Sequence, residues 1–137
     1  MGEVKVQLTL KNVGDITRAK DGHIKQERIR QITVDAVVDT GASNLIITEA
    51  LRDKLGLEVI DHGNATLGNN GKVLYQITEP IEVRWQNRFT VRHPVVLPGS
   101  EEVLLGVIPL EDMDLIVDPV RQTLSGAHGD QVAYMVR

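Results

Sequence analysis

The segment Val37-Val38-Asp39-Thr40-Gly41-Ala42-Ser43 carries the most information in this 137-residue chain, because an ionisable side chain follows two apolar ones at a turn. Upstream of it, apolar residues occupy every second position, at Ile32, Val34, Ala36 and Val38. A period of two is typical of a β-strand with one buried face. The sequence therefore predicts a strand that delivers Asp39 to a tight turn, which Gly41 permits.

Most of the remaining chain is also expected to form short strands. Alternating or short apolar runs predict strands at 4–10, 44–47, 81–85, 89–97, 103–105 and 115–117. A hairpin is expected within 120–137, with its turn near 126–129. Because no linker or repeat divides the chain, residues 1–137 are expected to form one mainly β domain.

Two short helices and one exposed hairpin interrupt these strands. Thr48 can cap a helix at 49–55, and Pro109 can start a helical turn over 110–114. Between the two helices, Asn69-Asn70-Gly71 predicts the tip of a hairpin, since Asn-Gly readily adopts positive φ angles.

Composition excludes several classes of protein. No stretch approaches the ~20 apolar residues that a membrane span needs, and no export signal is visible, so a cytoplasmic protein without a membrane partner is expected. The chain has no cysteine, which excludes disulfides and thiolate metal sites. A net charge of −4 and only four aromatic residues argue against nucleic acid as a partner. The four histidines have no metal-ligand spacing, so no metal site is expected.

The chemistry of the Asp39 turn requires a second carboxylate. Two carboxyl groups brought together can share one proton, so that one acts as a base while the other acts as an acid. Asp-Thr-Gly occurs once in the chain, and the second copy must therefore come from another molecule. Homodimerisation would then be part of the mechanism.

These motifs resemble the retropepsin-like aspartic peptidases, in a form closer to cellular and bacterial members than to viral ones. Two hydrophobic residues precede Asp39-Thr40-Gly41-Ala42, Leu104-Leu105-Gly106 matches a later hydrophobic-hydrophobic-Gly motif, and the hairpin at Asn69-Asn70-Gly71 falls between them, where the family has its flap. The resemblance implies an all-β, closed barrel-like single lobe with one or two short helices, which forms a homodimer and hydrolyses peptide bonds without a cofactor.

The resemblance also implies a role for each matching residue. Asp39, Thr40 and Gly41 would form the catalytic turn, with Asp39 activating a water and Thr40 bonding the partner chain. Leu104, Leu105 and Gly106 would support that turn. The residues expected to contact a peptide or protein substrate are Ala42, Ser43, Leu67, Gly68, Asn69, Asn70 and Gly71.

Other interpretations remain open at this point. Viral members commonly have an acidic residue and an arginine where this chain has Ser43 and Val107, and this joint departure allows a dimeric module that binds peptides without cleaving them. Asp-Thr-Gly is also common turn material, and an Asn-Gly hairpin is more often a plain turn than a substrate lid. The segment 120–137 could join the dimer interface or pack on its own domain.

Overall fold

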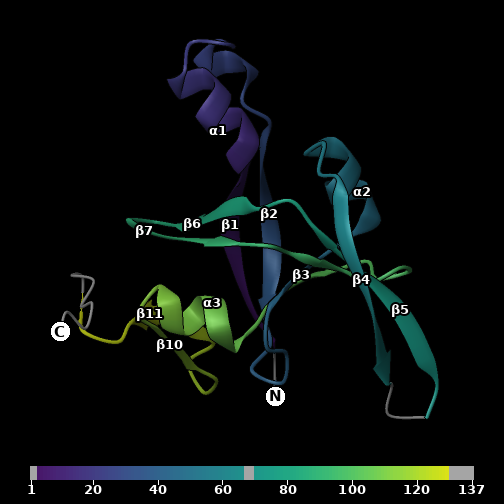
Figure 1. Cartoon of the computed structure of the whole chain (residues 1–137). Coiled ribbons are helices and arrows are strands. Elements are labelled where there is room, and N and C mark those ends of the chain that lie inside the picture. The colour runs from purple at the N-terminus through teal and green to yellow at the C-terminus, as the bar shows by residue number, and fades with distance from the viewer. Residues whose placement is uncertain (1–2, 67–69, 130–137) are drawn as a thin grey trace, which may run out of the picture.

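The computed structural model describes residues 3–66 and 70–129, and nine of its strands form one twisted sheet (Figure 1). In spatial order, these are β4 (Val59–Thr66), β5 (Lys72–Thr78), β8 (Val95–Val96), β3 (Leu45–Ile47), β9 (Val103–Leu105), β2 (Gln31–Val38), β1 (Val4–Asn12), β6 (Ile81–Trp85) and β7 (Arg88–Arg92). A separate hairpin contains β10 (Leu115–Asp118) and β11 (Thr123–Gly126). The helices are α1 (Val13–Lys20), η1 (Gln26–Arg28, a 3-10 helix), α2 (Glu49–Lys54) and α3 (Val107–Asp112).

The sheet is open, and the expectation of a closed barrel is therefore wrong. Its two edges are β4 and β7, and no register joins them among the described residues. Each edge strand belongs to a hairpin, and the two hairpins extend to different sides of the molecule (Figure 1). The edge strand β4 exposes Asp61, His62 and Asn64, and polar side chains of this kind protect an unpaired edge from further pairing.

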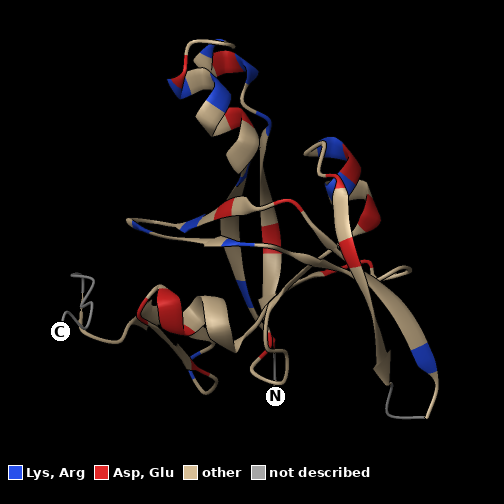
Figure 2. Cartoon of the chain, in the orientation of Figure 1, with Lys and Arg blue, Asp and Glu red and all other residues tan. Residues whose placement is uncertain are grey.

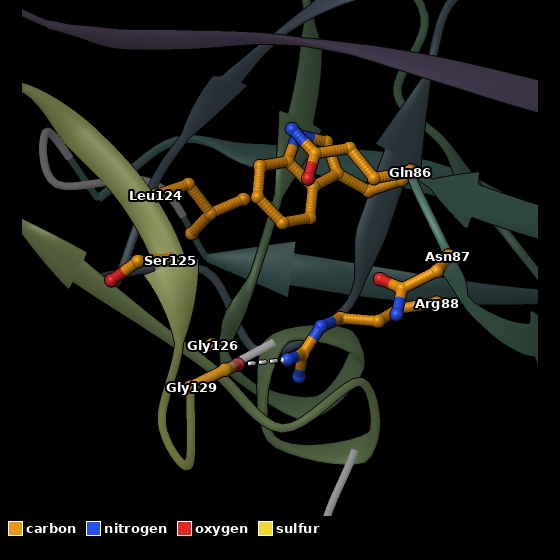
Figure 3. A pocket seen from close by; sticks show the side chains of 8 residues that line it. Gln86, Asn87, Arg88, Leu124, Ser125, Gly126 and Gly129 are labelled. Atoms are coloured by element: carbon orange, nitrogen blue, oxygen red, sulfur yellow. Dashed lines mark hydrogen bonds between the residues drawn. The ribbon is translucent and has the colours of Figure 1, made fainter. Parts of the chain in front are cut away.

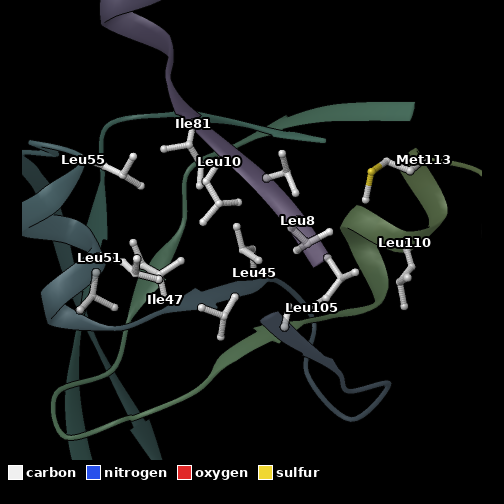
Figure 4. Close-up of a cluster of buried hydrophobic side chains, with 14 of the residues drawn as sticks. Leu8, Leu10, Leu45, Ile47, Leu51, Leu55, Ile81, Leu105, Leu110 and Met113 are labelled. Carbon is white, nitrogen blue, oxygen red and sulfur yellow. The ribbon is translucent and has the colours of Figure 1, made fainter. Parts of the chain in front are cut away.

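A single hydrophobic core lies between the sheet and helices α2 and α3. Figure 4 shows Leu8 and Leu10 of β1 facing Leu45 and Ile47 of β3 across it. All four side chains are completely buried. Burial stabilises the fold by about 2 kcal/mol for each such side chain. The helices complete the core through Leu51, Leu55, Leu110 and, just after α3, Met113.

Helix α1 was not expected from the sequence, and the domain has three α-helices within its described residues where two short ones were predicted. Gly14 and the β-branched residues of this segment have weak helical propensity, which conceals the helix. A capping signal was nevertheless present. Asn12 accepts a hydrogen bond from the Asp15 backbone N–H at 3.0 Å and, through Nδ2, donates one to the Leu55 carbonyl at 2.7 Å.

Charged groups hold α1 against the chain that enters β2, and acidic and basic residues alternate over this end of the molecule (Figure 2). The Asp15 carboxylate is only 4% exposed. It accepts hydrogen bonds from Arg30 Nε at 2.8 Å, Arg30 Nη2 at 3.0 Å and the Arg30 backbone N–H at 2.9 Å, and it also contacts Arg18. The hydrogen bonds from Arg30 outweigh the opposing effect of burial and hold the pKa of Asp15 well below its usual value.

The two predicted helices are present with small differences in their ends. Helix α2 begins after Thr48, whose hydroxyl accepts a hydrogen bond from the Leu51 N–H at 3.1 Å, as expected of a cap. Helix α3 begins at Val107 instead of Pro109, because the backbone carbonyls of Ala42 and Ser43 accept its first N–H groups. None of the helices in the described part of the chain is long and apolar enough to cross a membrane.

The buried side chain of Arg88 fastens the last described segment to the sheet (Figure 3). Its guanidinium donates to the carbonyls of Met113 at 2.9 Å, Asp114 at 2.8 Å and Gly129 at 2.6 Å. Gly126 makes this approach possible, since an added Cβ would lie 1.9 Å from the Gly129 oxygen. An interior arginine of this kind is stable because carbonyl oxygens satisfy its donors.

The hairpin formed by β10 and β11 turns at 119–122 and was not expected. Residues 127–129 form a turn directly after β11, near the position 126–129 at which a turn was expected. Asp118 Oδ1 accepts hydrogen bonds from the backbone N–H groups of Val120 and Arg121 at 3.0 and 3.1 Å, which stabilises the turn at 119–122. The strand expected beyond residue 129 lies outside the described residues.

Candidate active site

Asp39 lies at the end of β2, where a parallel neighbour holds the backbone. Val38 pairs with Leu105 of β9, and the Asp39 N–H donates to the Leu105 carbonyl at 3.0 Å. Up to Ala36, exposed and more buried residues alternate along the strand, and Ala36 itself is buried. Because the strand ends at Val38, Asp39 lies at the edge of the core.

The turn after Asp39 is closed by short local hydrogen bonds. The Ala42 N–H donates to the Asp39 carbonyl at 3.1 Å, and the Gly41 N–H donates to Asp39 Oδ1 at 2.9 Å. A Cβ on Gly41 would lie 3.1 Å from the same carboxylate oxygen, so glycine leaves the least crowded approach. Thr40 and Gly41 are exposed and Asp39 is half-buried, which leaves the carboxylate open to a ligand or to another chain.

Leu104, Leu105 and Gly106 lie directly beneath this turn. Strand β9 runs between β2 and β3, parallel to the first and antiparallel to the second, so Leu105 pairs with both Val38 and Leu45. The Gly106 N–H donates to the Asn44 carbonyl at 3.1 Å. A side chain at Gly106 would place its Cβ 2.4 Å from that oxygen, so the close approach requires glycine.

The first turn of α3 completes the attachment. Its first two N–H groups, from Val107 and Ile108, donate to the carbonyls of Ala42 and Ser43, both at 2.9 Å. Helix N-termini leave such donors without partners inside the helix, and here the turn itself supplies the acceptors. The structure therefore brings the two sequence motifs, which lie far apart in the chain, into one hydrogen-bonded unit.

An apolar cleft of about 450 Å³ borders this unit, between the Asp39 turn and the hairpin of β4 and β5. We call it the proximal pocket; its lining is Gly41, Ala42, Ser43, Asn44, Ile46, Ala65, Tyr75, Ile77, Val95 and Leu97. Tyr75 can lie across the hairpin because its cross-strand partner is Gly63, where an added Cβ would be 2.3 Å from the phenol. The cleft can accommodate apolar side chains beside Asp39.

The expected binding residues are placed unevenly around this cleft. Ala42 and Ser43 line it. Asn70 and Gly71 lie outside it, just before β5, and Asn70 has the positive φ of 66° that the Asn-Gly signal predicted. Leu67, Gly68 and Asn69 lie outside the described residues.

Sequence reasoning missed most of the apolar lining. The sequence signal that could have revealed this lining was the alternation of Val73, Tyr75 and Ile77 in β5, which places three apolar side chains on one face of an exposed hairpin. This face has no core to cover, since all three residues are only partly buried. Such a face is typical of a binding surface.

Within the described residues, the turn and the cleft beside it hold one carboxylate, that of Asp39. Among the described residues, the hydrogen bond to the Asp39 carboxylate comes from Gly41 alone, and no group of three potential metal ligands forms anywhere in 3–66 or 70–129. A single carboxylate with this geometry can act as a base or as an acid, but both roles in one step require a second group.

Comparisons with known proteins agree with these motifs. A family model described as "gag-polyprotein putative aspartyl protease" matches residues 26–112, which include the Asp39 turn, the β4–β5 hairpin and Gly106. A search of curated proteins found no match.

Two solved structures share the fold. The retroviral protease-like domain of Ddi1 from Leishmania major has a TM-score of 0.56 and 16% identity, with coverage of 91% of this chain and 88% of that one. A retropepsin-like aspartic protease from Rickettsia conorii has a TM-score of 0.52 and 17% identity, with coverage of 85% and 77%. Because the family model spans more than half of the chain, and cellular proteins share its fold, the chain belongs to the gag-polyprotein aspartyl protease family, a group of retropepsin-like aspartic peptidases.

Proposed function

We propose that the protein is an aspartic endopeptidase that acts as a symmetric homodimer, with one Asp39 from each chain in a shared active site. The observation that supports it most strongly is the half-exposed Asp39 carboxylate in a turn fixed by Leu105, Gly106 and α3, beside an apolar cleft. Membership of the aspartyl protease family supports the same proposal.

The reaction needs two protonation states in adjacent carboxyl groups. One ionised Asp39 removes a proton from a water as that water attacks the scissile amide carbon, and its protonated twin supplies the proton that the leaving nitrogen requires. Like charges at close range favour a single shared proton, so symmetry alone produces the acid and the base. The described chain contributes one of these groups, and the dimer contributes both.

The surroundings of Asp39 have matching roles. Exposed Thr40 would hydrogen-bond the partner's backbone and hold the two turns in register, while Gly41 keeps the backbone close to the carboxylate. The β4–β5 hairpin would act as a flap over a peptide bound in extended form, with apolar side chains in the proximal pocket. The absence of cysteine agrees with activity in the cytoplasm.

The test is the isosteric substitution Asp39→Asn, assayed on unfolded protein and on a peptide library between about pH 4 and pH 7. We expect kcat to fall by a factor of about 10⁴ or more, because no group then exchanges the proton, while the dimer remains folded. Sedimentation and circular dichroism check the fold and the assembly. Asp35→Asn is the matched control, since Asp35 is an exposed aspartate on the same strand. Cleavage that persists in Asp39→Asn, or a strictly monomeric active protein, contradicts the proposal.

A second candidate function is a dimeric module of the same fold that binds extended peptides without cleaving them. The specific observation in its favour is that Ser43 and Val107 stand where viral relatives commonly place an ion pair, and their backbone groups here serve the attachment of α3. Peptide binding by the wild-type chain without any product, at every pH of the assay, would favour this alternative.

A further inference from the structure

A second cavity adjoins the proximal pocket, and none of the residues 39–43 lines it. This distal pocket, of about 340 Å³, is lined by Asn44, Ile60, Asp61, Ile77, Val91, Arg92 and His93. Asn44 and Ile77 line both cavities, so the two are neighbours that share a wall. Alternate residues of an extended peptide point to the same side, and two adjoining pockets along one hairpin therefore suit residues i and i+2.

An irregularity in β4 shapes the distal pocket. Val59 pairs with Thr78 and Asp61 pairs with Ile77, so one extra residue, Ile60, is inserted between them as a bulge. Bulges redirect side chains, and here Ile60 and Asp61 both line the cavity although they are consecutive in the strand. Residue Ile60 is 56% exposed, which is unusual for an isoleucine and leaves it accessible to a ligand.

Arg92 is the distinctive group in this cavity. The arginines of the same hairpin, Arg84 and Arg88, each have a carboxylate oxygen within 4.0 Å of a guanidinium nitrogen. Among residues 3–66 and 70–129, no carboxylate oxygen lies that close to the guanidinium of Arg92. Its Nε donates to Asn44 Oδ1 at 3.4 Å, which is a weak hydrogen bond because of its length; the same oxygen accepts the Leu45 N–H at 2.8 Å. The half-buried guanidinium thus has donors to offer to an acceptor in the pocket.

The other charged and polar groups of the cavity are consistent with an acidic ligand. Asp61 accepts the His62 backbone N–H at 2.8 Å and is exposed, so water screens its repulsion of an anion. His93 Nδ1 lies 2.9 Å from the Thr78 carbonyl, which makes that nitrogen a donor to the backbone. Ile60, Ile77 and Val91 provide an apolar wall on the way to Arg92.

We propose that the distal pocket selects a glutamate side chain in the substrate, two residues away from an apolar side chain in the proximal pocket. The glutamate methylenes pack on the apolar wall and its carboxylate forms a charge-assisted pair with Arg92, which makes Arg92 a specificity-determining residue. This inference rests on the proposed function for its substrate class, an extended peptide, but it concerns binding and not the chemical step.

Selectivity is measured with a peptide that the wild-type protein cleaves, prepared with Glu, Gln or Lys at each position in turn. We expect one position at which kcat/KM is about 10-fold higher for Glu than for Lys, with Gln intermediate. In Arg92→Glu the preference at this position is expected to reverse, and in Arg92→Gln it is expected to disappear. The matched control is Arg28→Glu, which makes the same charge change at an exposed arginine of η1 and should keep the wild-type preference.

A parallel binding experiment separates this inference from the proposed catalysis. Fluorescence anisotropy with the labelled Glu and Lys peptides is measured on Asp39→Asn protein, with and without Arg92→Glu. An Arg92-dependent preference in binding supports the distal pocket even if no variant cleaves, an outcome that overturns only the proposed catalysis. Cleavage with a Glu-to-Lys ratio that is the same in the wild type and in Arg92→Glu overturns the inference and leaves the catalysis intact.

Discussion

The two ends of the β1–β2 hairpin are held by different kinds of interaction. At the Asp39 end, backbone N–H and carbonyl groups join the turn to β9 and α3. At the opposite end, the carboxylate of Asp15 and the guanidinium of Arg30 join α1 to β2. Backbone attachment does not titrate and tolerates no added atoms, whereas ionic attachment depends on pH and on charge.

Because the two attachments differ in kind, we expect activity and stability to respond to different substitutions in this domain. A substitution at the Asp39 end acts on the geometry of a carboxylate that the proposed reaction uses. A substitution at the α1 end acts on the free energy of unfolding, far from the reacting groups. Three predictions, in order of decreasing effect, test this separation.

The largest effect is expected for Gly106→Ala. The added Cβ would lie 2.4 Å from the Asn44 carbonyl and 2.6 Å from the Ala42 carbonyl, so the turn must move. We expect the free energy of unfolding to fall by about 3 kcal/mol, as in overpacked interiors, together with loss of peptidase activity. Urea unfolding and the cleavage assay measure the two effects. Val107→Ala is the control, because it keeps the backbone donor of residue 107 and removes side-chain atoms without adding any. A fully active Gly106→Ala protein would show that the turn is not tightly held.

A smaller effect, confined to stability, is expected for Asp15→Asn. Removing one partner of a buried ion pair costs roughly 3 to 5 kcal/mol, but Arg18 and Arg30 are about half exposed and stay solvated, so we expect a loss of about 2 kcal/mol. Because the pKa of Asp15 is lowered in the folded state, its contribution is complete above about pH 4 and is lost as the pH falls below that value. Unfolding curves between about pH 2 and pH 7 should therefore converge for the two proteins at low pH. Curves that stay parallel over this range would refute the ionic role.

The smallest effect is expected for Arg18→Ala. Arg18 is 48% exposed and contacts Asp15 within one helix turn, whereas Arg30 makes three hydrogen bonds to the same carboxylate. We expect a loss of about 0.5 kcal/mol for Arg18→Ala and a clearly larger one for Arg30→Ala. Thermal unfolding of the two variants side by side gives the ranking, and an equal loss would show that the carboxylate does not distinguish its partners.

The sequence predicted the parts of the fold that depend on local pattern. Strand alternation located β1, β2 and β6, Thr48 marked the start of α2, and Asn-Gly marked the β4–β5 hairpin. The Asp39 motif and Leu104-Leu105-Gly106 could be identified because each has residue types that a tight turn or a close backbone approach requires. The resemblance to retropepsin-like peptidases, which these motifs carried, is confirmed by the family match.

Contacts between distant segments of the chain were decided by tertiary packing and could not be predicted from local pattern. The sheet stays open because its two edge hairpins diverge. Helix α1 is held by the hydrogen bonds between Asp15 and Arg30 near the start of β2, although Asn12 indicated where the helix is capped. The cleft lining and Arg92 could not be predicted because strand periodicity says which residues share a face but not which faces meet. Local sequence thus determined the Asp39 turn, and long-range packing determined the cleft beside it.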